Sequence, residues 1–404
     1  MGLEIAACRT PDETIASIGP VAHYFGIPLR PQDHVRFTPF VEPSRAFTAR
    51  DDGVVVGGCA SFPFELTVPG GFVRAAGVTT VGVLPTHRRR GILRDLMREQ
   101  LDDVRRRGEP VAALWASEDT IYGRFGYGMA SVCADIELPK ASVAFALPFE
   151  RRGSFRLLGE AEALAAFPEV YDRVRARQPG MLSRVPEWWQ HRVLADSEHR
   201  RQGGGHMNRV LLARDGRASG YALYRLFQKF EAGVTVGHLQ VIEAVADGAD
   251  ATRELWRHLL DIDWVASIKA TLLPLDHPLW FLLARPREAG LRVRDGLWIR
   301  LVDLPAALAA RGRGDAAPVV IEVADAFCPW NAGRWRIAPS GVERTTAEPE
   351  LACDVGTLGS VYLGGFTFRR LVRAARVAEL RAGAAERADA LFPADLAPWC
   401  PEIF

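Results

Sequence analysis

The sequence of 404 residues lacks the signals of several broad classes of protein. It contains no run of about 18 apolar residues, so we expect no helix that spans a membrane. Its first residues, MGLEIAACRTPDE, show no basic region followed by an apolar run, which argues against a secretory signal peptide. Its formal net charge is only +1, so it lacks the excess of basic residues that is typical of a nucleic-acid-binding protein.

Signals of metals, disulfide frameworks and nucleotides are missing as well. The six cysteines lack CxxC spacing, and the nine histidines lack HxxxH and HExxH spacing. We therefore expect no metal site, and we interpret the cysteines as reduced thiols of a cytoplasmic protein. The absence of GK[ST] argues against a nucleotide-hydrolysing P-loop, and the absence of GxGxxG argues against a dinucleotide-binding fold.

What the sequence does contain is a basic loop between a buried strand and an amphipathic helix, in residues 78–97. Apolar Ala76–Leu84 predicts the strand, and apolar residues at helical spacing predict a helix over about 90–107. The loop between them, RRRG at 88–91, therefore lies at a helix start. Such a start presents unpaired N–H groups and a partial positive charge, so we predict that it binds a phosphate group.

The order of the predicted elements indicates an α/β (α+β) protein of three units. The first unit holds the basic loop and ends near residue 137, with Ala130–Leu138 as its last strand. The second repeats the strand–helix order, with strand Gly233–Ala244 before helix Ala251–Leu260. The connecting loop there, VADGAD, is acidic and would repel an anionic cofactor, so this unit resembles a duplicate without a cofactor site.

Two further expectations concern the rest of the chain. The second unit should carry separate helices over Glu160–Phe167 and Glu169–Gln178. The third unit begins near residue 291 and ends on apolar Phe404. A frayed tail is usually polar, so we expect this end of the chain to pack into the protein.

Two motifs of the first unit resemble GNAT acetyltransferases. The pattern Val83-x4-Arg88-x-x-Gly91-x-Leu93 resembles the pyrophosphate loop of that fold, and YGRFGY at 122–127 resembles its later helix. Over the whole chain the similarity is to the enhanced intracellular survival (Eis) family of N-acetyltransferases. It rests on the segments THRRRGILRDLM, ALWASEDTIYGRFGYG, GYALYR, DGLWIRLVDLPAALAARG, LGSVYLGG and the final E-x-F.

The resemblance implies tandem GNAT folds followed by a sterol-carrier-protein-like domain. The active GNAT domain would span residues 1–137, the degenerate one 138–290 and the sterol-carrier-like domain 291–404. The resemblance also implies acetyl-CoA as co-substrate, a homohexamer, and aminoglycosides, polyamines or lysine-like amines as acceptors. A lipid-binding or interaction protein that acts through the third unit stays open as the alternative.

Acetyl transfer to an amine needs a base, an acid for the thiolate and N–H donors for the oxyanion. Tyr127 fits the acid role, because a phenol can donate a proton to the departing thiolate. The resemblance implies that the base is the terminal carboxylate, carried by Phe404. That carboxylate is a weak base, so it could instead hold the cationic substrate while water carries the proton.

The remaining expected site residues surround the two substrates. The loop pattern and the resemblance place the co-substrate against Val81, Val83, Arg88, Arg89, Gly91 and Leu93, with Ser117 near the acetyl group. An amine cation could be bound by Glu118, Glu402 and Asp33. Asp33 lies in HYFGIPLRPQDHVRFTPF, which also carries basic residues. With few sure acids for a multiply charged aminoglycoside, a smaller amine or a peptide amine is a plausible acceptor.

Overall fold

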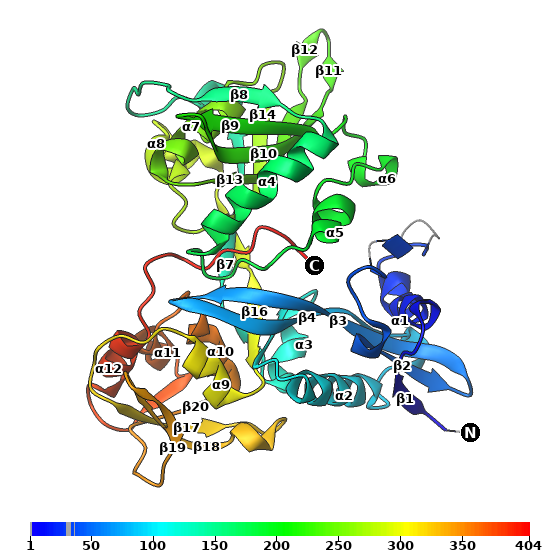
Figure 1. Ribbon diagram of the computed structural model, residues 1–404, viewed down its shortest axis with the longest axis vertical. Coiled ribbons are helices and arrows are strands. Elements are labelled where there is room, and N and C mark those ends of the chain that lie inside the picture. Colours follow the sequence, from blue (N-terminus) through cyan, green and yellow to red (C-terminus); the bar gives the residue numbers. More distant parts are fainter. Residues whose placement is uncertain (1, 30–33, 36) are drawn as a thin grey trace. The chain divides into compact units, whose positions relative to one another are not determined.

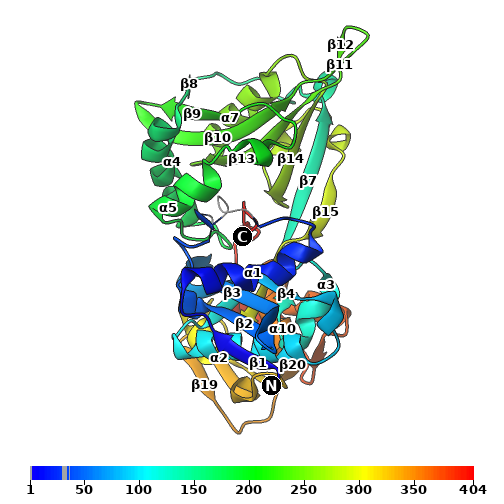
Figure 2. The same cartoon turned by 90° about the vertical axis from the view of Figure 1, so that its right-hand side faces the viewer.

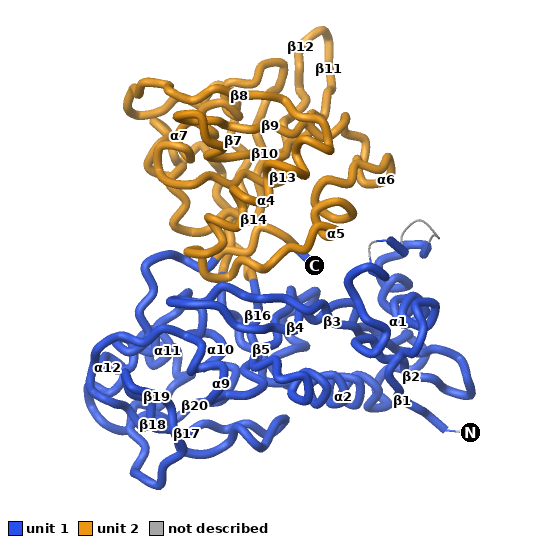
Figure 3. Tube along the Cα trace, in the orientation of Figure 1, with its two compact units in different colours: residues 1–131, 297–398, 403–404 blue, residues 132–296, 399–402 orange. Residues whose placement is uncertain are grey.

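The computed structural model describes residues 2–29, 34–35 and 37–404. The chain forms two compact units (Figure 3). Unit 1 comprises residues 1–131, 297–398 and 403–404, and unit 2 comprises residues 132–296 and 399–402. Unit 1 therefore contains both the basic loop and most of the C-terminal third of the sequence.

The first seven-stranded sheet lies in unit 1 (Figure 1). Strands β4 and β5 run parallel, but they pair at only three positions, Ala75–Gly77 with Val111–Ala113. Strand β4 continues for six residues beyond its last pair with β5, so the two strands part at Gly77. In sheet order the strands are β1 (Glu4–Ala7), β2 (Ala46–Asp51), β3 (Val54–Val68), β4 (Gly71–Val83), β5 (Val111–Trp115), β16 (Leu297–Leu301) and β6 (Gly128–Met129).

Two helices cover opposite faces of this sheet, α1 (Pro11–Tyr24) and α2 (Ile92–Arg106) (Figure 2). Two neighbouring glycines of β3 show the arrangement. A Cβ at Gly58 would lie 2.1 Å from the Ser17 carbonyl oxygen of α1, and a Cβ at Gly57 would meet Ile92 of α2. Side chains of successive strand residues point to opposite faces, so α1 and α2 lie on different sides. The helix predicted over about 90–107 is confirmed as α2.

Two strands pair in a different sheet from the one that the sequence order suggests. The prediction of Ala130–Leu138 as the last strand of the first unit is wrong, because β7 (Val132–Pro139) pairs with β14 (Ser267–Pro274) in unit 2. Strand β16 instead pairs with β5 and β6 in unit 1. Pairing follows burial and available edges rather than distance along the chain. The domain boundaries at 137 and 290 stay a prediction.

Unit 2 holds a second seven-stranded sheet. Strands β13 and β14 are parallel, and helix α7 (Ala249–Asp261) connects them along the chain, just as α2 connects β4 to β5. One continuous helix, α4 (Glu160–Arg175), replaces the two predicted ones, since Pro168 stays inside it while Phe167 and Tyr171 are buried. In sheet order the strands are β15 (Arg292–Asp295), β7, β14, β13 (His238–Ala246), β10 (Arg217–Phe227), β9 (Asn208–Arg214) and β8 (Ser154–Leu157).

The C-terminal part of unit 1 has its own five-stranded sheet, in the order β19-β18-β17-β20-β21. Strands β17 and β20 are parallel and the other pairs are antiparallel. The elements are α9 (Leu304–Ala310), β17 (Val319–Ala324), β18 (Gly333–Ala338), β19 (Gly341–Arg344), β20 (Leu351–Asp354), α10 (Val355–Tyr362), α11 (Phe368–Arg373), β21 (Val377–Glu379) and α12 (Ala384–Leu391).

Candidate active site

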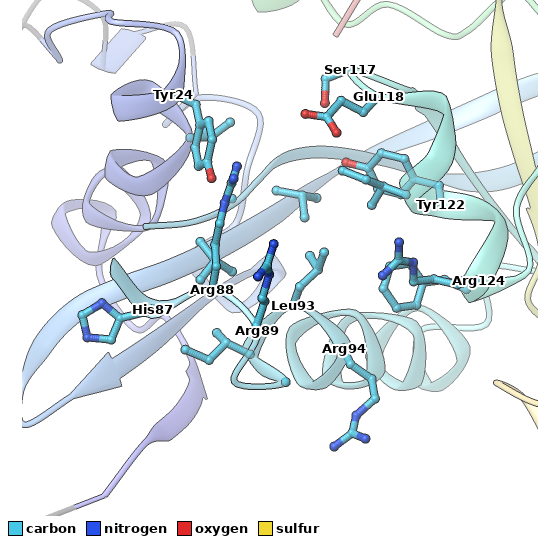
Figure 4. A pocket seen from close by; sticks show the side chains of 18 of the residues that line it. Tyr24, His87, Arg88, Arg89, Leu93, Arg94, Ser117, Glu118, Tyr122 and Arg124 are labelled. Atoms are coloured by element: carbon cyan, nitrogen blue, oxygen red, sulfur yellow. The ribbon is translucent and has the colours of Figure 1, made fainter. Parts of the chain in front are cut away.

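A single cavity of about 960 Å³ brings most of the predicted site residues together, wholly within unit 1. Figure 4 shows Arg88 and Arg89 on one side, Ser117, Glu118 and Tyr122 on the other, and Leu93 between the two groups. All the predicted co-substrate residues line it, as does Glu118. The residues in question are Val81, Val83, Arg88, Arg89, Gly91, Leu93 and Ser117.

The basic loop has the geometry expected of a phosphate site. Gly91 is the N-cap of α2, with a φ of 86°, and no side chain caps the helix there. The first N–H groups of a helix have no partner inside the helix, so those of Ile92, Leu93 and Arg94 are free of intrahelical bonds. Gly91, Ile92, Leu93 and Arg94 all line the cavity. An anion in the cavity could therefore meet backbone donors and a partial positive charge together.

The arginines of the loop differ in their surroundings. The Arg88 guanidinium lies 4.5 Å from the centre of the Tyr24 ring, at the end of α1. Arg89 lines the cavity and has a left-handed φ of 63°, a conformation that is uncommon for a residue other than glycine. Arg90 instead donates to the Asp51 carboxylate at 2.7 Å and is not among the lining residues. Two of the three loop arginines are thus presented to a ligand.

The structure distinguishes the two tyrosines of YGRFGY. Tyr122 ends α3 (Asp119–Tyr122), lines the cavity and is 6% exposed. Burial, followed by the charges of Cys59 and Glu118, raises the pKa of Tyr122 to about 12. Tyr127, the residue selected from the sequence, does not line the cavity. Its hydroxyl is buried without a hydrogen-bond partner among the described residues, and burial raises its pKa.

A turn explains why the two tyrosines separate. The 3-10 turn η4 (Gly123–Phe125) follows α3, and Gly126 then adopts a φ of 81°. A Cβ at Gly126 would lie 2.2 Å from Arg300 Nη1, so the chain is forced close to the buried Arg300. Tyr127 therefore enters the apolar interior, where its ring lies 5.9 Å from that of Tyr122.

The C-terminal residues lie in two different environments. The Phe404 ring lies 5.2 Å from the Phe64 ring, and a Cβ at Gly77 would be 3.2 Å from it. Strands β4 and β5 separate at Gly77, so Phe404 lies beside the point where the two strands diverge. Phe404 is 8% exposed, which confirms the expected packed terminus.

Glu402 is engaged in unit 2 and does not line the cavity. Its carboxylate accepts from Arg184 Nε at 2.8 Å and from Trp188 Nε1 at 2.7 Å. Two strong donors already satisfy it, so the structure offers no support for the predicted contact of Glu402 with an amine cation. Asp33, the third predicted acid, lies outside the described residues.

The corresponding position in unit 2 is acidic. Helix α7 begins after Gly248 and carries Asp250 in its first turn. Asp247 accepts from Arg173 at 2.9 Å, and Asp250 accepts from Arg253 at 2.9 Å. A carboxylate in the first turn already complements the helix dipole, which leaves little attraction for a phosphate.

Comparison with known proteins assigns this arrangement to a family. Residues 10–130 and 180–301 each match an acetyltransferase (GNAT) domain, and residues 304–401 match a sterol carrier protein domain. N-acetyltransferase Eis of Mycobacterium tuberculosis is 35% identical over 384 residues, 91% of each chain. The chain belongs to the Eis family of N-acetyltransferases.

Further relatives agree with this Eis-family assignment. The crystal structure of Eis1 from Mycobacterium abscessus superposes with a TM-score of 0.86 and 36% identity, covering 99% of this chain and 100% of that one. An uncharacterised N-acetyltransferase of Streptomyces coelicolor is 43% identical over 360 residues, 86% of each chain. The tandem GNAT folds and the sterol-carrier-like domain implied by the resemblance are thereby confirmed, and the protein is an acetyltransferase.

The part of the chain that the structure describes shows neither a metal-binding cluster nor a membrane-spanning helix. No group of three or more His, Cys, Asp or Glu side chains is arranged to hold a metal ion in that part of the chain. Likewise, no helix within it has both the length and the apolar character needed to cross a bilayer.

Tyr24, Tyr122 and Arg124 are among the lining residues that the sequence interpretation missed. Tyr122 had a local signal, since it opens the motif whose last residue was chosen instead. Tyr24 and Arg124 had none, because a tyrosine at a helix end and an exposed arginine are common in any sequence.

Proposed function

We propose that this enzyme transfers the acetyl group of acetyl-CoA to a primary amine by direct attack on the thioester in a ternary complex. The observation that supports this is the one cavity that joins a phosphate-type loop to Ser117, Glu118 and Tyr122. Its volume of about 960 Å³ suits a ligand of the size of an acyl-CoA. Acetyl-CoA, when bound, supplies the thioester carbonyl that the amine attacks.

Each residue of the chain then has a stated task. The loop at 88–91 and the α2 N-terminus hold the phosphates, while Val81 and Val83 pair with the pantetheine by their backbone. Ser117 lies near the acetyl group, and the Glu118 carboxylate attracts the amine. As the carbon–nitrogen bond forms, the amine releases a proton to the terminal carboxylate of Phe404 or to water. As the carbon–sulfur bond breaks, Tyr122 donates a hydrogen bond and then a proton to the sulfur, and it regains that proton from solvent. Its raised pKa keeps the hydroxyl protonated at neutral pH.

The direct test measures thiol release from acetyl-CoA with aminoglycosides, polyamines and lysine-like amines as acceptors. We expect amine-dependent release with at least one class. No release with any amine, together with no binding of CoA in calorimetry, would contradict the proposal. The homohexamer implied by the resemblance stays a prediction.

Gly91→Ala is expected to raise the dissociation constant of CoA about fivefold. A left-handed φ costs a residue with a Cβ about 1–2 kcal/mol, and relief of that strain would shift the N–H groups at the start of α2. Gly108→Ala is the matched control, because Gly108 follows α2, has a φ of 65° and lies outside the cavity. Calorimetry should show weaker CoA binding for Gly91→Ala alone, and equal effects of both variants would remove Gly91 from the phosphate site.

Extending the chain by one glycine after Phe404 is expected to lower kcat about tenfold to a hundredfold. The addition turns the terminal carboxylate into an amide and moves the charge by about 3.5 Å. The carboxylate would then neither accept the amine proton nor hold the ammonium ion. Phe404→Leu keeps the carboxylate and should retain most of the activity. An extended enzyme with an unchanged kcat would refute any role for this group.

A further inference from the structure

Phe327 places the sterol-carrier-like part of the chain in the wall of the cavity. It lies between β17 and the short turn η8 (Pro329–Asn331), inside the stretch that matches the sterol carrier protein domain. The other lining residues lie between Val21 and Phe125, inside the first GNAT match. Both stretches belong to unit 1. A residue from the stretch that matches the sterol carrier protein domain therefore contributes to a wall that is otherwise formed by the first GNAT stretch.

Two contacts hold Phe327 in that wall. Its ring meets the Phe125 ring edge-on, with centres 5.1 Å apart and planes at 68°. The Arg98 guanidinium lies 3.9 Å from the ring centre, and Arg98 Nη1 donates to the Phe327 carbonyl oxygen. Arg98 is on α2 and is not among the lining residues. In Figure 1 the segment between β17 and β18 lies beside α2, in agreement with these contacts.

The segment that carries Phe327 is fixed by a buried carboxylate. Asp325 accepts from the Cys328 backbone N–H at 2.8 Å, from Asn331 Nδ2 at 3.1 Å and from Arg300 Nη2 at 2.6 Å. Arg300, on β16, is fully buried. Charge-assisted hydrogen bonds of this kind fix a turn firmly. The chain thus presents Phe327 in one position before any ligand arrives, which is the condition for a good binding residue.

We propose that Phe327 binds the acyl-CoA co-substrate and that Arg98 is its positioning residue; this rests on the proposed function. The phosphate loop, Leu93 and Arg94 belong to the same helix, α2, whose Arg98 holds Phe327. Phe327 thus packs between α2, whose first turn lies at the phosphate loop, and Phe125, which follows Tyr122 by three residues. Its partly buried ring offers apolar surface to the co-substrate. The sterol-carrier-like domain then has a task in catalysis that needs no lipid.

Phe327→Ala is expected to raise the dissociation constant of CoA and the KM for acetyl-CoA about tenfold, which corresponds to about 1.4 kcal/mol. The KM for the amine should stay within about twofold, because the proposed contact of the ring is with the co-substrate and not with the amine. Arg98→Ala should shift the same two constants in the same direction by about threefold, since it only positions the ring. Calorimetry with CoA and steady-state kinetics with both substrates measure these values on the full chain.

The matched control uses a second arginine–aromatic contact between the same two segments. Arg105, also on α2, lies 4.3 Å over the Trp330 ring, and neither residue lines the cavity. Arg105→Ala should leave the KM for acetyl-CoA unchanged. An increase as large as that of Phe327→Ala would show that loop packing alone matters, and it would overturn the proposal.

The remaining outcomes separate this proposal from the proposed function. Failure of the unaltered enzyme to bind CoA overturns both. Binding of CoA by the unaltered enzyme and equally tight binding by Phe327→Ala overturns this inference alone. If the alanine variant does not fold, Phe327→Leu keeps an apolar side chain and should raise the dissociation constant about threefold. An unchanged constant in that folded variant also overturns the proposal.

Discussion

Tyr122→Phe is expected to lower kcat about a hundredfold or more, with little change in the KM for acetyl-CoA. A positioned proton donor contributes roughly 10²–10⁴ to a rate, and this substitution removes the proton while it keeps the ring. Tyr122 lines the cavity beside Ser117 and Glu118, and its pKa of about 12 keeps it protonated at the pH of an ordinary assay. Steady-state rates of thiol release at saturating acetyl-CoA check the effect.

Tyr127→Phe is the matched control for that experiment. The Tyr127 hydroxyl is buried and lacks a hydrogen-bond partner among the described residues, so its removal should cost no stability. We expect kcat to stay within about twofold of the unaltered enzyme. The opposite pattern, an active Tyr122→Phe and an inactive Tyr127→Phe, would return the proton-donor role to Tyr127.

The position of the basic loop at the start of α2 could be predicted from the sequence because its causes are local. Helical spacing of apolar residues placed α2, and the RRRG run before it placed the basic side chains at the helix start. Which of Tyr122 and Tyr127 lines the cavity could not be predicted from neighbouring residues. It depends on the left-handed turn at Gly126 and on Arg300, which comes from a strand far along the chain.

The features that the sequence could not supply are all long-range. Strand β16 (Leu297–Leu301) pairs with β5 (Val111–Trp115), which lies in the first third of the sequence. Nothing in the residues of β16 itself indicates which strand it pairs with. The contact of Phe327 with Arg98 has the same character. Such pairings are selected by the total burial of a sheet or wall, which periodicity within one segment does not encode.

Arg184→Met is expected to lower the free energy of unfolding of unit 2 by about 3–5 kcal/mol. The Arg184 side chain is 1% exposed, and it pairs with Glu243 at 2.5 Å and with Glu402 at 2.8 Å. Burial alone would lower the pKa of Arg184, but the two carboxylates raise it well above the usual value, so the charge persists. Its removal leaves the buried Glu243 carboxylate and the largely shielded Glu402 carboxylate without their common partner.

The Tyr221 hydroxyl, which donates to Glu243 at 2.5 Å, and Trp188 cannot replace a missing positive charge. Arg156→Met is the control within unit 2, because Arg156 and its partner Glu162 are 63% and 56% exposed, and such a pair contributes about 0–1 kcal/mol. Urea unfolding followed by tryptophan fluorescence should separate the two variants by at least about 2 kcal/mol in the free energy of unfolding.

Because Phe404 follows Glu402 by two residues, Arg184→Met should also lower kcat where the protein is still folded. Equal stability of both variants, with full activity, would show that Arg184 does not hold the C-terminal segment.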